Sequence, residues 1–101
     1  KIMTINEIVK NYSLNEEKMK QIRDAMEIAS CAIERDEPGR RGKFEHKIAK
    51  IIGERDDNWY IAEDVAQAFF MEKKWPEVFR DFYGQEPKFR TFLEDWRMGE
   101  L

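Results

Sequence analysis

The chain contains a single cysteine and a single histidine, so a Cys–His nucleophile pair could only consist of Cys31 and His46. Such a pair requires the imidazole within hydrogen-bond reach of the thiol. Cys31 lies among alanines and isoleucines in a strong helical pattern, where a small apolar residue is expected to pack inward. His46 lies on the lysine-rich side of a different predicted helix. These positions favour structural roles for both residues, and we predict a protein that is not an enzyme.

The 21 Asp and Glu residues could instead bind a metal or act as acid and base. The segment 56–58, followed by Glu63 and Asp64, resembles an interrupted calcium loop, but it lacks the glycine and the spacing of an EF-hand. A zinc site usually draws on several cysteines and histidines, and this chain has one of each. Spacing alone places no carboxylate pair in a common pocket. We therefore expect no metal and no other cofactor.

Positive charge is concentrated in a basic segment, which consists of Arg40, Arg41, Lys43, Lys47 and Lys50. The three lysines, together with His46, fall on one side of a helix. Such a stripe could bind the phosphates of a nucleic acid or an acidic protein, or it could be a solvated helix face. The whole chain has a net charge of −3, which is a poor match for a general nucleic-acid-binding protein. Nucleic-acid binding is therefore the alternative rather than the preferred function.

Aromatic residues are concentrated in the second half of the chain, where 11 of the 13 lie between positions 59 and 96. Five phenylalanines follow helical spacing and are predicted to be core: Phe69, Phe79, Phe82, Phe89 and Phe92. The other candidates lie at predicted helix ends or beside them, and are Trp59, Trp75, Tyr83, Trp96, Arg80, Arg90 and Arg97. Because Trp, Tyr and Arg are enriched in binding hot spots, we predict that these seven residues bind a partner. The alternative for the four aromatic residues among them is that they pack into the core.

Helix signals cover most of the sequence. A capping box at 4–7 predicts a first helix over about 5–11, and a second box at 13–16 begins a long helix over about 14–35. A Pro-Gly turn then predicts a mobile loop over 36–42. Further helices are predicted over about 43–54 and 59–73. Pro76 and Pro87 suit the first positions of two more, over 76–83 and from 87 onward.

The sequence therefore predicts an all-α fold: one domain over 1–101, a compact bundle of five or six helices with a long second helix (about 14–35) and short aromatic-rich C-terminal helices. Met19, Ile28 and Cys31 widen the apolar stripe of the second helix, so both a monomer and a homodimer are expected possibilities. The lone cysteine suits a reducing cytoplasm, and no apolar run is long enough for a membrane span.

The preferred function is that of a small protein-binding module acting as an adaptor, a regulatory subunit or an inhibitor of a larger protein. Size, acidity and the lack of a catalytic set are typical of phage or mobile-element proteins that bind host enzymes. The chain starts with Lys1, and we expect Met3 to be the natural start of translation. The basic segment carries the alternative of a nucleic-acid-associated protein.

Overall fold

The computed structural model describes residues 2–53, 60–97 and 99, and all of the regular structure among them is helical. The six helices are α1 (Ile5–Asn11), α2 (Glu16–Glu34), α3 (Arg40–Ile52), α4 (Tyr60–Met71), α5 (Pro76–Tyr83) and α6 (Pro87–Arg97). The longest is α2, with 19 residues. The all-α class, the long second helix and the aromatic-rich C-terminal helices are thus confirmed.

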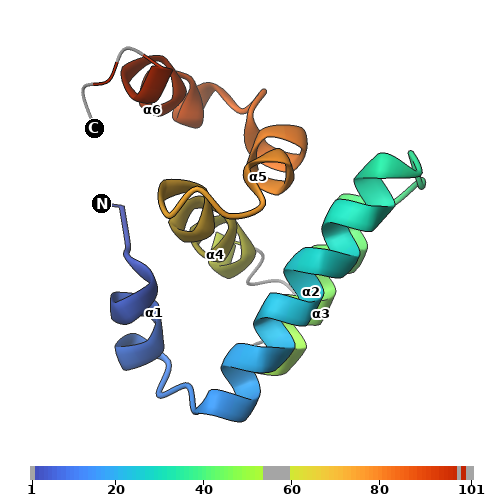
Figure 1. Cartoon of the computed structure of the whole chain (residues 1–101), viewed down its shortest axis with the longest axis vertical. Helices are drawn as coiled ribbons and strands as arrows, with labels where there is room; N and C mark the ends of the chain where they lie inside the picture. The colour runs from blue at the N-terminus through green and yellow to red at the C-terminus, as the bar shows by residue number, and fades with distance from the viewer. Residues whose placement is uncertain (1, 54–59, 98, 100–101) are drawn as a thin grey trace.

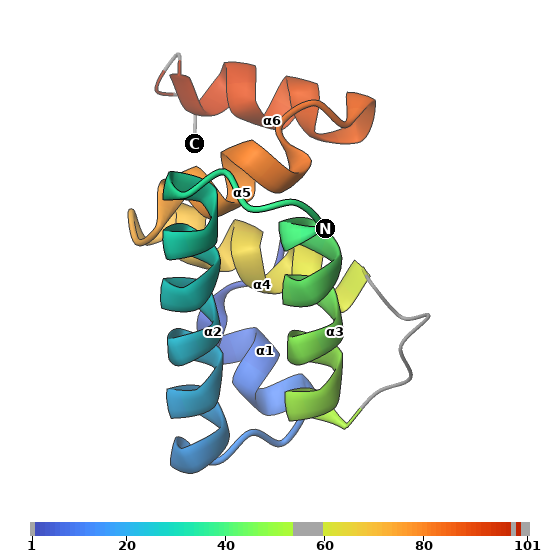
Figure 2. The same cartoon turned by 90° about the vertical axis from the view of Figure 1, so that its right-hand side faces the viewer.

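Helices α2 and α3 run side by side as an antiparallel hairpin, and the other helices lie on one side of it (Figures 1 and 2). Helix α4 packs against α1, α3 and α5, while α5 also contacts α2. Helix α6 lies at the end of the molecule next to α5 (Figure 2). The opposite face of the hairpin carries no helix, so one long surface of α2 and α3 is open in Figure 2.

The first two helices begin at side-chain caps. At α1 the predicted capping box is present, because Thr4 Oγ1 accepts from the Glu7 amide and Glu7 Oε1 accepts from the Thr4 amide. The predicted box at 13–16 is wrong. The cap of α2 is Asn15, whose Oδ1 accepts from the Lys18 amide at 2.8 Å, while Ser13 adopts φ 53° in the preceding turn. Asparagine and serine cap helices equally well, so the local sequence did not decide between the two positions.

The predicted loop over 36–42 is too long, because helix α3 already begins at Arg40. The left-handed turn is made by Asp36 and Gly39, with φ values of 53° and 69°. Arg40 then bonds back to Asp36 and to the Glu37 carbonyl oxygen at 3.0 Å each, which ties the turn to the start of α3. The helix ends at Gly53, which adopts φ 87°, and so it is shifted toward the N-terminus relative to the predicted range 43–54.

The described helices share one hydrophobic core, and aromatic residues fill its C-terminal part. Four of the five phenylalanines predicted as core are buried, and Phe89 is partly buried against them. Phe79 lies at the centre, with ring centroids of Phe89 and Phe92 at 5.0 and 5.7 Å. These contacts attach α6 to α5. Helix α4 is buried over most of its circumference, as its broad apolar face predicts. None of the described helices combines the length and the apolar character needed to cross a membrane.

Candidate functional site

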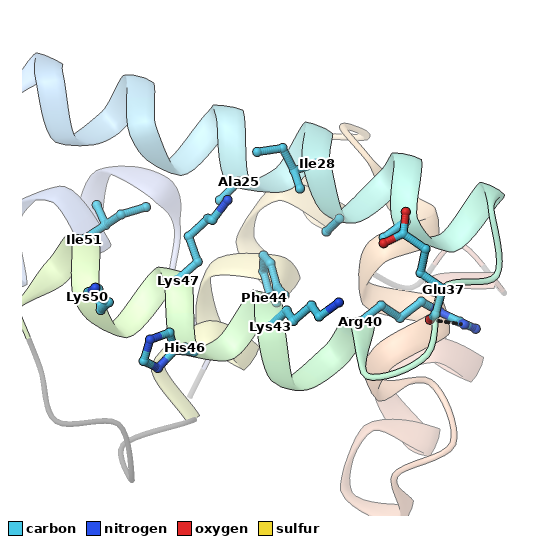
Figure 3. Close-up of a pocket in the computed structure, with 12 residues that line it drawn as sticks. Ala25, Ile28, Glu37, Arg40, Lys43, Phe44, His46, Lys47, Lys50 and Ile51 are labelled. Carbon is cyan, nitrogen blue, oxygen red and sulfur yellow. Dashed lines mark hydrogen bonds between the residues drawn. The ribbon is translucent and has the colours of Figure 1, made fainter.

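The open face of the α2–α3 hairpin contains a groove with a cavity volume of about 540 Å³. We call it the α2–α3 groove; its lining consists of Ala25, Ile28, Ala29, Ala32, Glu37, Arg40, Lys43, Phe44, His46, Lys47, Lys50 and Ile51 (Figure 3). Helix α2 supplies a wall of alanines and Ile28. Helix α3 supplies Phe44 and Ile51 at the base and basic side chains at the rim. An apolar strip therefore lies directly beside a basic strip.

Ile28 is the most informative residue of the apolar wall. Its side chain is 53% exposed, and it is one of two large hydrophobic residues with such exposure among the described residues. The other α2 residues that line the groove are all small, namely Ala25, Ala29 and Ala32. Small side chains on α2 leave room above Phe44 on α3. The groove thus results from the alanine-rich sequence of α2, and Ile28 stands exposed at its edge.

The basic rim comes from Lys43, Lys47 and Lys50, which are all exposed. Their spacing of four and three residues places them in one row along α3, and Lys47 extends from α3 toward α2 (Figure 3). Within the described part of the chain, none of the three ammonium groups forms an ion pair. This lysine row is therefore available for an anionic partner. Glu37 is the only acidic residue in the groove lining.

The two arginines predicted to extend this patch have a different role. Arg40 binds Asp81 on α5, with Nε and Oδ2 2.9 Å apart, and the hydrogen bond and charge of Asp81 raise the pKa of Arg40. Arg40 also pairs with Asp36 at the hairpin turn. Both arginines of the basic segment lie in α3, outside any loop, and both bind carboxylates of the protein itself.

Arg41 takes part in a partly buried polar network between α3 and the α5–α6 connection. Its guanidinium donates to the Phe82 carbonyl oxygen at 2.8 Å, pairs with Glu45 and Glu86, and stacks 4.7 Å from the centroid of the Tyr83 ring. Burial lowers the pKa of Arg41, but the hydrogen bond with Glu86 and the charge of Glu45 outweigh it, so the pKa is raised. Arg41 therefore stays charged and fastens the C-terminal helices to the hairpin.

Tyr83 was predicted as an edge residue of a binding face, and the structure overturns that expectation. It is fully buried, and its hydroxyl donates to Glu45 Oε2 at 2.8 Å. Burial, the hydrogen bond and the charge of Glu45 together raise the pKa of Tyr83. The sequence placed Tyr83 at a helix end, but the chain folds α6 back over that end, and the aromatic ring becomes core.

The tryptophans predicted as partner anchors are only partly accessible. Trp75 is half-buried: its indole Nε1 donates to Glu27 Oε2 on α2 at 2.7 Å, and its ring packs edge-on against Phe69. Trp96 is half-buried against Phe70, with centroids 5.3 Å apart. Trp59 lies outside the described residues. Both described tryptophans therefore make internal contacts that fasten α5 and α6.

The three predicted arginines of the C-terminal helices converge. Arg80, Arg90 and Arg97 line one hollow between α5 and α6 together with Gly84, Leu93 and Glu94, and its cavity volume is about 460 Å³. Spacing could not show this, because Arg80 lies on a different helix from the other two. We call this cavity the arginine hollow.

Glu63 on α4, considered above only as part of an interrupted calcium loop, is a buried carboxylate at 3% exposure. Lys88 Nζ lies 2.7 Å from its Oε1, and no residue in the described ranges forms a hydrogen bond with its Oε2. Burial, followed by the charge of Glu63, raises the pKa of the neighbouring Asp64. Among the described residues, no three Cys, His, Asp or Glu side chains form a group that could hold a metal ion.

Comparison with known proteins adds no identification, because no family model, curated protein or solved structure matches this chain.

Proposed function

We propose that this protein is a non-enzymatic protein-binding module, and that its α2–α3 groove receives an acidic amphipathic helix of a partner protein. The observation that carries the proposal is the apolar strip around Ile28 lying beside the row of Lys43, Lys47 and Lys50. Binding without chemistry is the common property of the adaptor, regulatory and inhibitor roles considered from the sequence.

A helix matches the groove because the lysine row itself follows helical spacing. The row from Lys43 to Lys50 rises about 10 Å along α3, which is about two helical turns. A partner helix with Asp or Glu at the same spacing of four and three residues could face all three lysines at once. Its apolar side would then cover Ile28 and the alanine wall, as amphipathic helices do in hydrophobic grooves.

Charge selects among the possible occupants. A nucleic acid could bind the lysines, but it would leave the apolar wall uncovered. Arg40 and Arg41 would not add phosphate contacts, because they form ion pairs within the fold. A second copy of the same groove is a poor complement, because Glu37 is the only acid in a lining that carries four Lys and Arg residues. Self-complementary interfaces need both signs of charge in the same patch. An acidic amphipathic partner satisfies both strips.

The test begins with a photo-activatable cross-linker at Ile28, introduced in the native host so that the covalent adduct identifies the neighbouring molecule. The affinity of the purified partner is then measured for the wild type, for Lys47→Glu and for Lys20→Glu. Lys20 is an exposed lysine on α2 outside the groove lining, and it provides the same charge change.

We expect Lys47→Glu to weaken binding by about tenfold or more, which corresponds to about 1.4 kcal/mol, while Lys20→Glu has little effect. Added salt should weaken the wild-type complex, because the lysine row is exposed. Equal losses for the two variants would contradict the groove. Cross-links to nucleic acid, or to a second copy of the chain, would replace the proposed partner with that molecule.

A further inference from the structure

The arginine hollow, like the lysine row of the α2–α3 groove, presents cations that form no ion pair with the described residues. Arg80, Arg90 and Arg97 are exposed, and no carboxylate in the described ranges forms an ion pair with any of them. Glu94 lines the same hollow, yet it lies beyond ion-pair distance of these guanidinium groups. By contrast, Arg40 and Arg41 bind carboxylates from three other parts of the chain.

The hollow is also partly preorganised. The Arg80 guanidinium lies 5.1 Å from the centroid of the Phe70 ring, and a cation–π contact of this kind holds the group in place without consuming its N–H donors. Arg90 and Arg97 project from the same helix at a spacing of seven residues, which is two turns, so they lie on one side of α6. The three arginines therefore line one hollow from two helices.

We propose that the arginine hollow binds a phosphate monoester dianion. The three arginines and Glu94 give the lining a net charge of +2. A phosphate monoester carries a charge of about −1.5 to −2 and three acceptor oxygens at neutral pH. A carboxylate carries half that charge and two oxygens. The planar guanidinium group donates two parallel hydrogen bonds to phosphate oxygens, an arrangement called a fork. Three such groups therefore match the three terminal oxygens of a phosphate monoester better than the two oxygens of a carboxylate.

The shape of the site favours one phosphoryl group over the backbone of a nucleic acid. A nucleic-acid strand is bound by a long stripe of cations, whereas these three arginines line a single hollow. A phosphodiester also has only one negative charge and two free oxygens. Residues 51–101 have seven Lys and Arg against twelve Asp and Glu, so a long polyanion would meet repulsion around the hollow. Leu93 at the wall provides an apolar surface for the carbon side of a monoester.

The experiment uses the full chain with two probes, phenyl phosphate and inorganic phosphate, and follows the backbone and arginine side-chain NMR signals during titration at low ionic strength. We expect saturable shifts at Gly84 and at the three arginines. Arg90→Ala and Arg97→Ala should each weaken binding by about tenfold or more. Arg90→Lys should recover only part of the loss, because lysine keeps the charge but not the fork. Arg23→Ala, at an exposed arginine on α2, is the matched control and should bind as the wild type does.

A pH series adds a second readout. The second pKa of a phosphate monoester is about 6, so binding should strengthen as the pH rises from about 5 to 7 and the dianion forms. The proposal is overturned if neither phenyl phosphate nor inorganic phosphate binds saturably. It is also overturned if Arg23→Ala loses as much affinity as Arg90→Ala and Arg97→Ala. Binding that stays constant over this pH range would also overturn it, because a monoanion would then suffice. Tighter, Arg90-dependent binding of a single-stranded oligonucleotide would replace the monoester with nucleic acid.

Discussion

Tyr83→Phe tests whether the hydrogen bond of the buried Tyr83 hydroxyl to Glu45, between α5 and α3, controls stability at high pH. The hydroxyl of Tyr83 donates to Glu45, whose Oε2 also lies 3.3 Å from Nε of Arg41. In the neutral range the substitution removes one hydrogen bond to a charged group, while Glu45 keeps its arginine. We therefore expect the free energy of unfolding to fall by about 1–2 kcal/mol.

The pH dependence follows from the raised pKa of Tyr83. A tyrosine in the unfolded chain loses its proton near its ordinary pKa of about 10, whereas the native protein still holds that proton. The native state then binds more protons than the unfolded state, so stability is fully present below pH of about 10 and falls as the pH rises above it. The limiting slope is about 1.4 kcal/mol per pH unit, and the accumulated loss at pH of about 11 is about 1.4 kcal/mol.

Urea unfolding measures how much the Tyr83 proton contributes to stability. It is carried out on the wild type, Tyr83→Phe and Tyr60→Phe as the pH is raised from neutral to about 11. The phenylalanine variant lacks the titrating group, so its deficit relative to the wild type should shrink as the pH rises. Tyr60→Phe removes the same hydroxyl from a half-exposed ring and should follow the wild-type dependence. If Tyr83→Phe keeps the full wild-type slope, or if tyrosinate absorbance from Tyr83 appears before the protein unfolds, the reasoning is refuted.

Two further predictions concern backbone space and buried charge. Gly84→Ala should lower the free energy of unfolding by about 1–3 kcal/mol, because the new Cβ would lie 2.4 Å from the Arg80 carbonyl oxygen. Gly42 lies on α3, where a Cβ would meet open space, so Gly42→Ala should raise the free energy of unfolding by about 0.5–1 kcal/mol. Urea midpoints that move in the same direction for both variants would contradict this contrast. Lys88→Met should lower the free energy of unfolding by about 1–3 kcal/mol, because it leaves the Glu63 carboxylate buried without its cation. Adding Glu63→Gln to that variant should restore most of the lost stability. A double variant as unstable as Lys88→Met alone would contradict that account.

Local signals predicted most of the fold. Thr4 and Glu7 form a capping box whose partners are three residues apart, and Pro76 and Pro87 begin helices because a proline at the first helical position needs no hydrogen-bond partner. The same local reasoning missed the start of α3. Besides its bonds to Asp36 and to the Glu37 carbonyl oxygen, Arg40 binds Asp81, which lies 41 residues away on α5, and local sequence patterns could not predict that contact.

Candidate site residues were harder to predict because exposure depends on which elements cover a helix end. Tyr83 and Trp96 both lie near predicted helix ends, yet Tyr83 is covered by α6 and Trp96 packs on Phe70. Ile28 shows the converse case. Ile28 extends the apolar stripe of α2, but no described helix covers that part of the α2–α3 hairpin. Ile28 therefore lines a groove instead of joining the core.

The cations of this protein divide into two groups by where their partners lie. Arg40 and Arg41 bind carboxylates on α5 and in the α5–α6 connection, so their charge holds the hairpin to the C-terminal helices. Lys47 in the groove and Arg90 in the hollow have no such partner among the described residues. Replacing a cation of the first group should therefore lower stability, whereas replacing one of the second should leave stability nearly unchanged and alter binding. Measuring stability and binding on the same variants separates the cations that hold the fold together from those that meet a ligand.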